Sequence, residues 1–201
     1  MKPCTCSAQD SVKESLIVRE GNVWRCEGCL TYSTLCGRLI TRKDLIKKET
    51  KMLVVFDVDD TLSKVGDRAD YLNQEPKDWD SYFDACHLDE PNKAVTRLAR
   101  ELLISGNQVE VWTGRPERLR EKTQNWLIAN GIPVRGTTPR ARNMVELRMR
   151  PDGDFRTDIE LKGQWLANSP KPDLMFDDRS KSVAHWRSLG ITVCQVADND
   201  F

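Results

Sequence analysis

The sequence predicts an α/β fold in which helices cover both faces of a doubly wound parallel sheet. A continuous apolar run at residues 52–56 is typical of a strand buried on both faces. After it, short apolar strand patterns alternate with helical patterns that end at glycines. This alternation favours right-handed crossovers, and folds built from them bind ligands at the carboxyl ends of their strands.

The elements after residue 52 can be assigned in order. We expect helices from Pro91 to the glycine at 106 and over residues 117–130, 157–167 and 181–189. Strands are expected over residues 108–113, 145–149, 173–176 and 191–196. Residues 63–90 fit no crossover, because aromatic side chains alternate there with many carboxylates. We interpret this segment as a small cap over the strand ends.

Composition excludes several classes of protein. With 39% hydrophobic residues the chain is a folded protein rather than a disordered one. No apolar run approaches the roughly 20 residues that span a bilayer. Residues 1–10 lack the apolar core of a secretory signal, so we expect a cytoplasmic protein, in the cell or in the host of a phage. The 31 basic and 31 acidic residues balance, which argues against a polycation that coats duplex DNA.

The charges are unevenly distributed along the chain. Residues 57–90 carry eleven acids and three bases, whereas residues 115–150 carry nine bases and three acids. An acidic segment beside a basic one is typical of a metal site next to a phosphate-binding wall. The alternative is two solvated faces that never meet.

Three acids within four positions follow the first strand, in the stretch Val54-Val-Phe-Asp57-Val-Asp59-Asp60-Thr-Leu62. Clustered carboxylates repel one another unless a cation compensates, and hard oxygen ligands suit a divalent ion. Asp57 and Asp59 point the same way from an extended chain, so one can attack while the other handles protons. The alternative is a strand that simply ends in an acidic turn.

A second short apolar strand delivers the adjacent pair Asp177 and Asp178. If the two strands are neighbours, the acids meet and complete the shell of the ion. The alternative, that one of the pair caps the following helix, does not account for both.

Between the acidic motifs a strand ends in Thr113-Gly114-Arg115. A hydroxyl, a glycine that admits backbone N–H groups and an arginine together predict a phosphate-binding turn. Lys162, on a predicted helix, is a candidate for the remaining positive charge, although a lone helical lysine is more often a surface residue.

The ordered motifs Asp57-x-Asp59-x-Thr61, Thr113, Lys162 and Asp177-Asp178 resemble those of the haloacid dehalogenase (HAD) superfamily of phosphatases over about residues 52–201. The resemblance implies that Asp57 attacks phosphorus, and that Asp59 protonates the leaving oxygen and then activates water. It implies that Thr113 and Lys162 hold the phosphoryl group. It also implies a Mg²⁺ ion that bridges Asp57, the Asp59 carbonyl and Asp177 or Asp178.

Residues 57–68, Gly114-Arg115, Asp158…Lys162, residues 177–179 and the ending 193–201 look more closely like the 3′-phosphatase domain of phage-type polynucleotide kinase/phosphatases. This resemblance implies functional roles for Arg68, Arg115 and Asp158, with the arginines gripping the phosphate or its neighbours. Asp60 departs from the usual glycine of the family. No G-x-x-x-x-G-K-[ST] motif occurs, so we expect no kinase activity, and relatives of this shape also hydrolyse free nucleotides.

Residues 1–50 are predicted to form a small separate module with a basic linker, and residues 51–201 the phosphatase domain. Cys4, Cys6, Cys26 and Cys29 provide the four thiolates of a structural Zn²⁺ site, with Cys36 as a rival ligand. A hairpin through residues 15–18 and 22–24 would join the cysteine pairs. Such a module is suited to nucleic-acid binding, and a dimer or partner contact is the alternative.

The leading hypothesis is therefore a magnesium-dependent phosphomonoesterase with an aspartyl-phosphate intermediate, which removes 3′-phosphates from nucleic-acid ends. A phosphatase of free nucleotides is the nearest alternative. A protein of another class, a zinc-dependent nucleic-acid adaptor without relevant catalysis, is less consistent with the complete set of acids.

Overall fold

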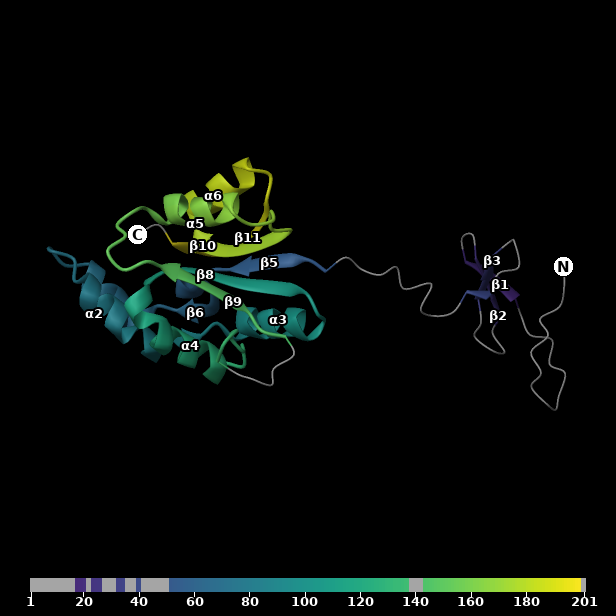
Figure 1. Cartoon of the computed structure of the whole chain (residues 1–201), viewed down its shortest axis with the longest axis horizontal. Coiled ribbons are helices and arrows are strands. Elements are labelled where there is room, and N and C mark those ends of the chain that lie inside the picture. Colours follow the sequence, from purple (N-terminus) through teal and green to yellow (C-terminus); the bar gives the residue numbers. More distant parts are fainter. Residues whose placement is uncertain are drawn as a thin grey trace. The chain divides into compact units, whose positions relative to one another are not determined.

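The structure is a computed structural model that describes residues 51–137 and 143–199, together with the backbone of four strands before residue 51 (Figure 1). The chain divides into two compact units, residues 1–50 and 51–201, and each is described by itself. None of the helices in the described part is long and apolar enough to cross a membrane.

The first unit contains an antiparallel sheet of order β1-β2-β3-β4. Its strands are β1 (Ile17–Glu20), β2 (Val23–Cys26), β3 (Tyr32–Thr34) and β4 (Leu39–Ile40). The pairing of β1 with β2 confirms the predicted hairpin, with both strands lying slightly later in the chain. Of the predicted zinc ligands, Cys4, Cys6 and Cys29 lie outside the described residues, as does Cys36, and only the backbone of Cys26 is described. Zinc binding stays a prediction.

The second unit is built on a parallel sheet of order β11-β10-β5-β8-β9. Its strands are β5 (Leu53–Phe56), β8 (Gln108–Pro116), β9 (Glu146–Arg150), β10 (Leu174–Arg179) and β11 (Thr192–Asn199). The helices are α3 (Lys93–Ile104), α4 (Arg120–Ala129), α5 (Asp158–Ala167) and α6 (Ser180–Ser188). Figure 1 shows α3 and α4 on one face of the sheet and α5 and α6 on the other, so the predicted doubly wound α/β fold is confirmed.

Two hydrophobic cores fill the layers on either side of the sheet. Val54 and Phe56 of β5 pack with the apolar faces of α3 and α4. Val55, between them, packs in the opposite layer with Val183 and Trp186 of α6. Because successive strand residues point to opposite faces, a strand between two helical layers must be apolar at every position. This explains the uninterrupted apolar run of β5.

The structure places the predicted elements within a few residues of their expected bounds. Thr157 starts α5 through a capping box with Glu160, as its helical pattern predicts. The strand β10 continues through the acidic pair to Arg179 instead of ending at Phe176. Asp177 still pairs in the parallel ladder with Gln195 of β11, so loss of apolar character does not end this strand.

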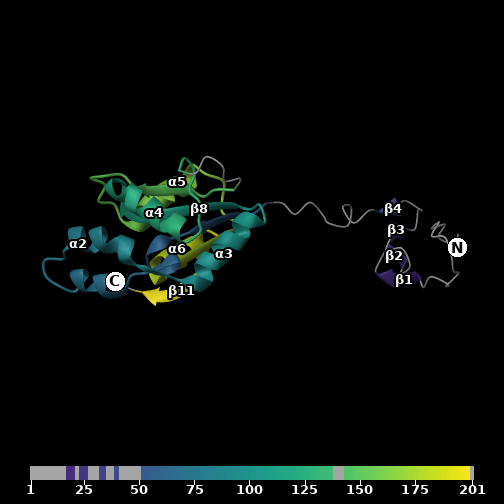
Figure 2. The same ribbon diagram turned by 90° about the horizontal axis from the view of Figure 1, so that it is seen from below.

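The segment 63–90, which we interpret as a cap, forms a set of short elements that extends to Pro91. Its elements are β6 (Ser63–Lys64), η2 (Gly66–Leu72), α2 (Trp79–Asp84), η3 (Ala85–Leu88) and β7 (Glu90–Pro91). The strands β6 and β7 pair antiparallel at the base of the cap. Figures 1 and 2 both show α2 beyond the carboxyl ends of the parallel strands. The cap therefore stands over the edge where an α/β sheet binds ligands.

Candidate active site

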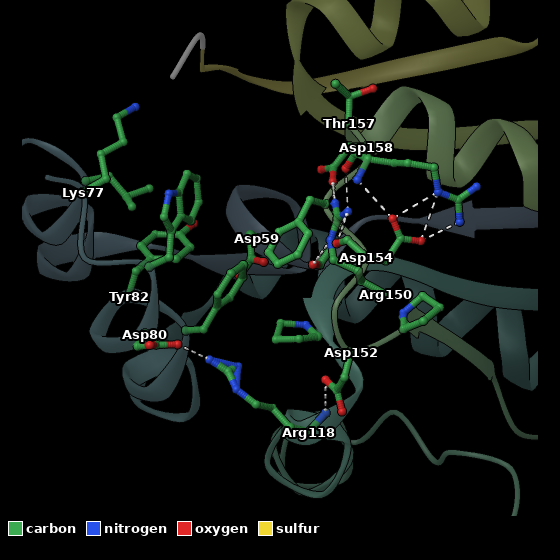
Figure 3. A pocket seen from close by; sticks show the side chains of 18 of the residues that line it. Asp59, Lys77, Asp80, Tyr82, Arg118, Arg150, Asp152, Asp154, Thr157 and Asp158 are labelled. Atoms are coloured by element: carbon green, nitrogen blue, oxygen red, sulfur yellow. Dashed lines mark hydrogen bonds and ion pairs between the residues drawn. The ribbon is translucent and has the colours of Figure 1, made fainter.

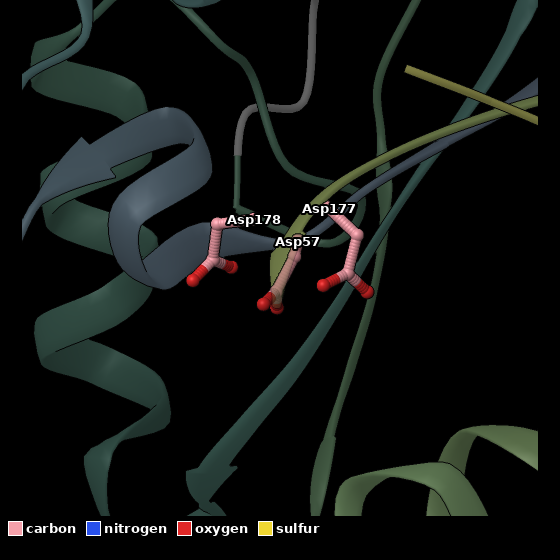
Figure 4. A group of neighbouring side chains, drawn as sticks. All are labelled: Asp57, Asp177 and Asp178. Atoms are coloured by element: carbon pink, nitrogen blue, oxygen red, sulfur yellow. The ribbon is translucent and has the colours of Figure 1, made fainter. Parts of the chain in front are cut away.

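The acids of the two predicted motifs meet at the carboxyl edge of the sheet. Asp57 follows β5, and Asp177 and Asp178 lie in the neighbouring strand β10 (Figure 4). A carboxylate oxygen from each of the three lies within 4.8 Å of the others. The Asp57 N–H also donates to the carbonyl of Phe176 at 3.0 Å, which fixes the start of one acidic motif beside the residue that precedes the other.

Lys162 of α5 is a buried counter-charge for this acid cluster. Its Nζ lies 3.0 Å from Asp57 Oδ1 and 3.6 Å from Asp177 Oδ2. Burial opposes the charge on the amine, yet Asp57 and Asp177 raise the pKa of Lys162 above its ordinary value. A lysine with 2% of its side chain exposed is not the surface residue that a helical position most often holds.

The acid cluster carries more negative charge than Lys162 neutralises. Burial raises the pKa of Asp57 well above its usual value; Lys162 lowers it, and Asp177 and Asp178 add to the rise. Burial and the charge of Asp177 likewise raise the pKa of Asp178 to about 7. Three converging carboxylates with this surplus fit a hard divalent cation such as Mg²⁺, which would relieve the repulsion.

Asp59 lies apart from the acid cluster and is held by two arginines. Arg68 Nη2 donates to Asp59 Oδ1, and Arg115 Nη2 donates to the same oxygen at 2.6 Å. Burial opposes ionisation of Asp59, but the charges and hydrogen bonds of Arg115 and Arg68 outweigh it and hold the pKa of Asp59 well below its usual range. In this arrangement Asp59 is held as a carboxylate, the form that can accept a proton, although the arginines make it a weak base.

Asp89 joins the two arginines from the far side and completes a buried network. It accepts from Arg68 Nε at 2.6 Å, from Arg115 Nη2 at 3.0 Å and from Ser63 Oγ at 2.9 Å. Sequence reasoning missed Asp89, because it is one of eleven acids in residues 57–90 and no spacing distinguishes it. Arg115 Nη1 is buried without a hydrogen-bond partner among the described residues, so this guanidinium keeps one donor unused.

Replacing Asp89 tests whether this network orients Asp59. Asp89→Ala leaves two buried guanidinium groups with less compensation, so we expect a loss of about 3 kcal/mol in the free energy of unfolding. We also expect kcat to fall about tenfold, because Asp59 is no longer held in one position. Thermal unfolding and steady-state kinetics measure both effects.

The matched control is Asp84→Ala, which removes an aspartate of the same cap whose ion pair with Lys122 is exposed. Exposed pairs contribute at most about 1 kcal/mol, so this variant should resemble the wild type. Equal behaviour of the Asp84 and Asp89 variants would contradict the positioning role.

Gly114 and Asp158 occupy one crowded place at the end of β8. A Cβ at Gly114 would lie 2.6 Å from Asp158 Oδ1, so the glycine makes room for this carboxylate. Asp158 in turn accepts from Arg150 Nη2 at 2.5 Å and from Arg179 Nη1 at 3.4 Å. Packing against Asp158 therefore explains a glycine at position 114, in addition to the predicted approach of backbone N–H groups to a ligand. The Asp158 carboxylate also binds two arginines.

Thr113 and Asp60 shape the backbone around the site. The Thr113 side chain is fully buried, and its hydroxyl accepts the N–H of Arg115 at 3.2 Å. Asp60 has φ of 53°, the only positive φ of a non-glycine residue in the described ranges, and its carboxylate accepts from the Val65 N–H at 2.9 Å. A glycine enters this left-handed conformation freely, and Asp is among the few other residues that tolerate it.

A pocket of about 750 Å³ lies between the cap and the strand ends (Figure 3). Of the predicted site residues, those that line it are Asp57, Asp59, Gly114, Asp158 and Asp178. The others are buried behind its wall: Arg68, Thr113, Arg115, Lys162 and Asp177. The structure therefore brings both acidic motifs to one pocket and puts all three predicted positive side chains, Arg68, Arg115 and Lys162, behind its wall.

Comparison with known proteins assigns the second unit to a family. Residues 51–201 match the polynucleotide kinase PNKP phosphatase domain, over about three quarters of the chain. The chain belongs to this phosphatase family. The predicted HAD-type phosphatase fold and the resemblance to polynucleotide 3′-phosphatase domains are thereby confirmed.

Solved structures share the fold of this PNKP-type phosphatase. A chain of the Pnkp1/Rnl/Hen1 complex has a TM-score of 0.59 at 22% identity, and a chain of the Pnkp1/Rnl/Hen1 RNA repair complex has 0.59 at 23%. The matches cover 85% and 82% of this chain, respectively. This chain spans only about half the length of those chains, 55% of the first and 51% of the second. The class C acid phosphatase from Bacillus anthracis with tungstate bound has a TM-score of 0.51 at 14% identity, covering 79% of this chain and 72% of its own.

Proposed function

We propose that this phosphatase is a magnesium-dependent phosphomonoesterase that phosphorylates Asp57 and removes 3′-phosphates from nucleic-acid ends. One observation carries the proposal. The Asp57 carboxylate lines the pocket, is paired with Lys162 and lies next to Asp177 and Asp178. In a PNKP-type phosphatase this is the placement that a nucleophile needs.

The chain's own groups account for two steps. In the first, a carboxylate oxygen of Asp57 bonds to phosphorus as the P–O ester bond breaks, and the leaving oxygen takes a proton from Asp59. In the second, Asp59 accepts a proton from water, which attacks the same phosphorus and releases inorganic phosphate and the free Asp57 carboxylate. Splitting the hydrolysis in this way replaces one difficult step with two easier ones.

Neighbouring groups support both steps. Lys162 offsets negative charge beside Asp57, and Thr113 fixes the backbone from which Arg115 reaches Asp59. Arg68 and Arg115 keep Asp59 ionised, and this is the form that accepts a proton from water in the second step. The first step needs the protonated form of Asp59, which donates to the leaving oxygen. Asp57, Asp177, Asp178 and the Asp59 carbonyl are the groups proposed to hold Mg²⁺, which when bound neutralises charge on the phosphoryl oxygens.

The substrate assignment rests on the family and on a neighbour in fold. The family is named for the phosphatase domain of a polynucleotide kinase, and one neighbour in fold is a chain of an RNA repair complex.

We propose that residues 1–50 bind Zn²⁺ through Cys4, Cys6, Cys26 and Cys29 and assist nucleic-acid binding. A dimer or partner contact through these residues is the alternative, as is a free nucleotide as the substrate.

A substrate panel tests the proposal. The wild type is assayed with a 3′-phosphorylated oligonucleotide, a nucleoside 3′-monophosphate and a nucleoside 5′-monophosphate, each with Mg²⁺ and with EDTA. We expect the highest kcat/KM for the oligonucleotide and a fall of at least about 10³-fold with EDTA, because several kcal/mol of charge stabilisation is lost.

Two outcomes would reject parts of this proposal. A preference for the 5′-monophosphate would reject nucleic-acid ends as the substrate and favour free nucleotides. Full activity in EDTA would reject the proposal that the acid cluster holds a catalytic metal. Deletion of residues 1–50 in the same assay separates a role in oligonucleotide binding, seen as a higher KM for the oligonucleotide alone, from a role in catalysis.

A further inference from the structure

Two exposed aromatic side chains line the pocket that contains Asp57. Trp79 begins α2 of the cap and is 50% exposed, and Phe155 lies between β9 and α5 and is 96% exposed. Scattered exposed apolar residues are ordinary, and Leu88 and Ile104 are examples outside this pocket. Two aromatic rings open to solvent at the rim of one pocket are unusual, because their burial by a ligand would be favourable.

Contacts with neighbouring residues hold both aromatic residues in place. Trp79 packs on Phe83 with ring centroids 5.9 Å apart and meets the edge of Tyr82 at 5.8 Å, so one side of the indole is held while half of it stays exposed. On either side of Phe155, the carbonyls of Asp154 and Arg156 accept from Arg150 Nη1 at 3.2 and 2.6 Å. This loop is tied to the strand below it, so the exposure of Phe155 is built into the loop.

The rings come from two separate walls of the pocket. Figure 3 shows the cap residues Lys77, Asp80 and Tyr82 on one side, and Arg150, Asp154 and Asp158 on the other. Trp79 belongs to the first segment and Phe155 to the second. An occupant of the pocket would therefore meet one aromatic surface from the cap and one from the loop before α5.

The arginines of the pocket are already paired with acids. Arg118 pairs with Asp80 at 2.5 Å, Arg150 and Arg179 pair with Asp158, and Arg156 pairs with Asp154. For Lys77, the structure gives only a contact with the Trp79 ring, at 6.0 Å from its centroid, within the described part of the chain. Paired guanidinium groups offer little attraction to a long phosphate backbone, so the rings are the main surface for affinity beyond the phosphate.

We propose that Trp79 and Phe155 are base-stacking surfaces that hold the nucleobases next to the 3′-phosphate. This inference rests on the proposed function and makes it more specific: the substrate is an unpaired, single-stranded 3′ end whose last bases are splayed onto the two rings. Stacking on an aromatic ring tolerates every base, so the enzyme selects an accessible end rather than a sequence.

A comparison of base-bearing and abasic substrates tests this assignment. One substrate is a single-stranded oligonucleotide with a 3′-phosphate; the other has the same backbone and phosphate, with its last two nucleosides abasic. The enzymes are the full-length wild type, Trp79→Ala, Trp79→Phe, Phe155→Ala and the control Leu88→Ala. Leu88 is 73% exposed in the cap but does not line the pocket.

We expect Trp79→Ala and Phe155→Ala each to lower kcat/KM about tenfold for the base-bearing substrate and less than twofold for the abasic one. Trp79→Phe should recover most of the loss, and Leu88→Ala should match the wild type. Phe155 is nearly free of contacts with its own chain, so its variant tests stacking even if Trp79→Ala disturbs the cap.

The inference is overturned if Phe155→Ala leaves kcat/KM for the base-bearing oligonucleotide unchanged, or lowers it equally for both substrates. The wild type separates this result from failure of the proposed function. If it hydrolyses both 3′-phosphorylated substrates with equal kcat/KM, only stacking is rejected. If it hydrolyses neither, the 3′-phosphatase assignment fails first.

Discussion

Asp57→Asn is expected to abolish turnover while the chain stays folded. An amide cannot displace an alkoxide from phosphorus, so kcat should fall by about 10⁴-fold or more, as when other enzymes lose their nucleophile. The fold should not suffer. Burial raises the pKa of Asp57; Lys162 opposes the rise and the neighbouring acids add to it, so the charged carboxylate is less favourable in the folded chain than in water. A neutral amide removes that unfavourable charge.

Two measurements check this result: kcat on the 3′-phosphorylated oligonucleotide, and Tm in EDTA. The control is Asp67→Asn, which neutralises an exposed acid ten residues along the chain and should leave both unchanged. We expect Tm of the Asp57 variant in EDTA to be no lower than that of the wild type. Turnover within tenfold of the wild type would end the assignment of Asp57 as nucleophile.

Lys162→Met should damage both stability and catalysis. The change removes the buried ammonium that lies 3.0 Å from Asp57 and 3.6 Å from Asp177 and leaves the carboxylates with less compensation. Breaking a buried pair typically costs about 3–5 kcal/mol, which corresponds to a fall in Tm of about 10 °C for a domain of this size. We expect kcat to fall about 10²–10³-fold, since a preorganised charge beside the reacting group is lost.

Magnesium distinguishes this electrostatic effect from poor packing. Because a divalent cation replaces part of the missing positive charge, the gain in Tm on adding Mg²⁺ should be larger for Lys162→Met than for the wild type. Lys181→Met, which changes an exposed lysine of α6, is the matched control and should behave as the wild type. An unchanged Tm and a kcat within a few-fold of the wild type would contradict the role of Lys162.

The fold was predictable because its signals are local and strong. The apolar run before Asp57 marks a doubly buried strand, and Thr157 with Glu160 marks the start of a helix. The end of β10 was wrong by three residues, because Asp177 is polar yet remains in the ladder, with Lys162 beside its carboxylate. The strands β3 and β4 are too short to show a period in the sequence.

The site was predictable as a set of residues but not as an arrangement. Clustered acids at strand ends indicate Asp57 and Asp178, and the pocket contains both. Contacts between distant segments have no pattern in the sequence. Asp89 binds both Arg68 and Arg115 only because the cap brings these residues together. Spacing along the chain records which residues share a strand or a helix, whereas ion pairs across elements depend on packing.

Trapping the phosphorylated enzyme identifies the residue that attacks phosphorus. The wild type is mixed with an oligonucleotide that carries a radiolabelled 3′-phosphate, quenched in acid within one turnover and digested to peptides. We expect label on the peptide that contains Asp57, released by hydroxylamine as an acyl phosphate is, and no label in Asp57→Asn. Hydrolysis without any labelled peptide, or label on a different residue, would contradict this expectation.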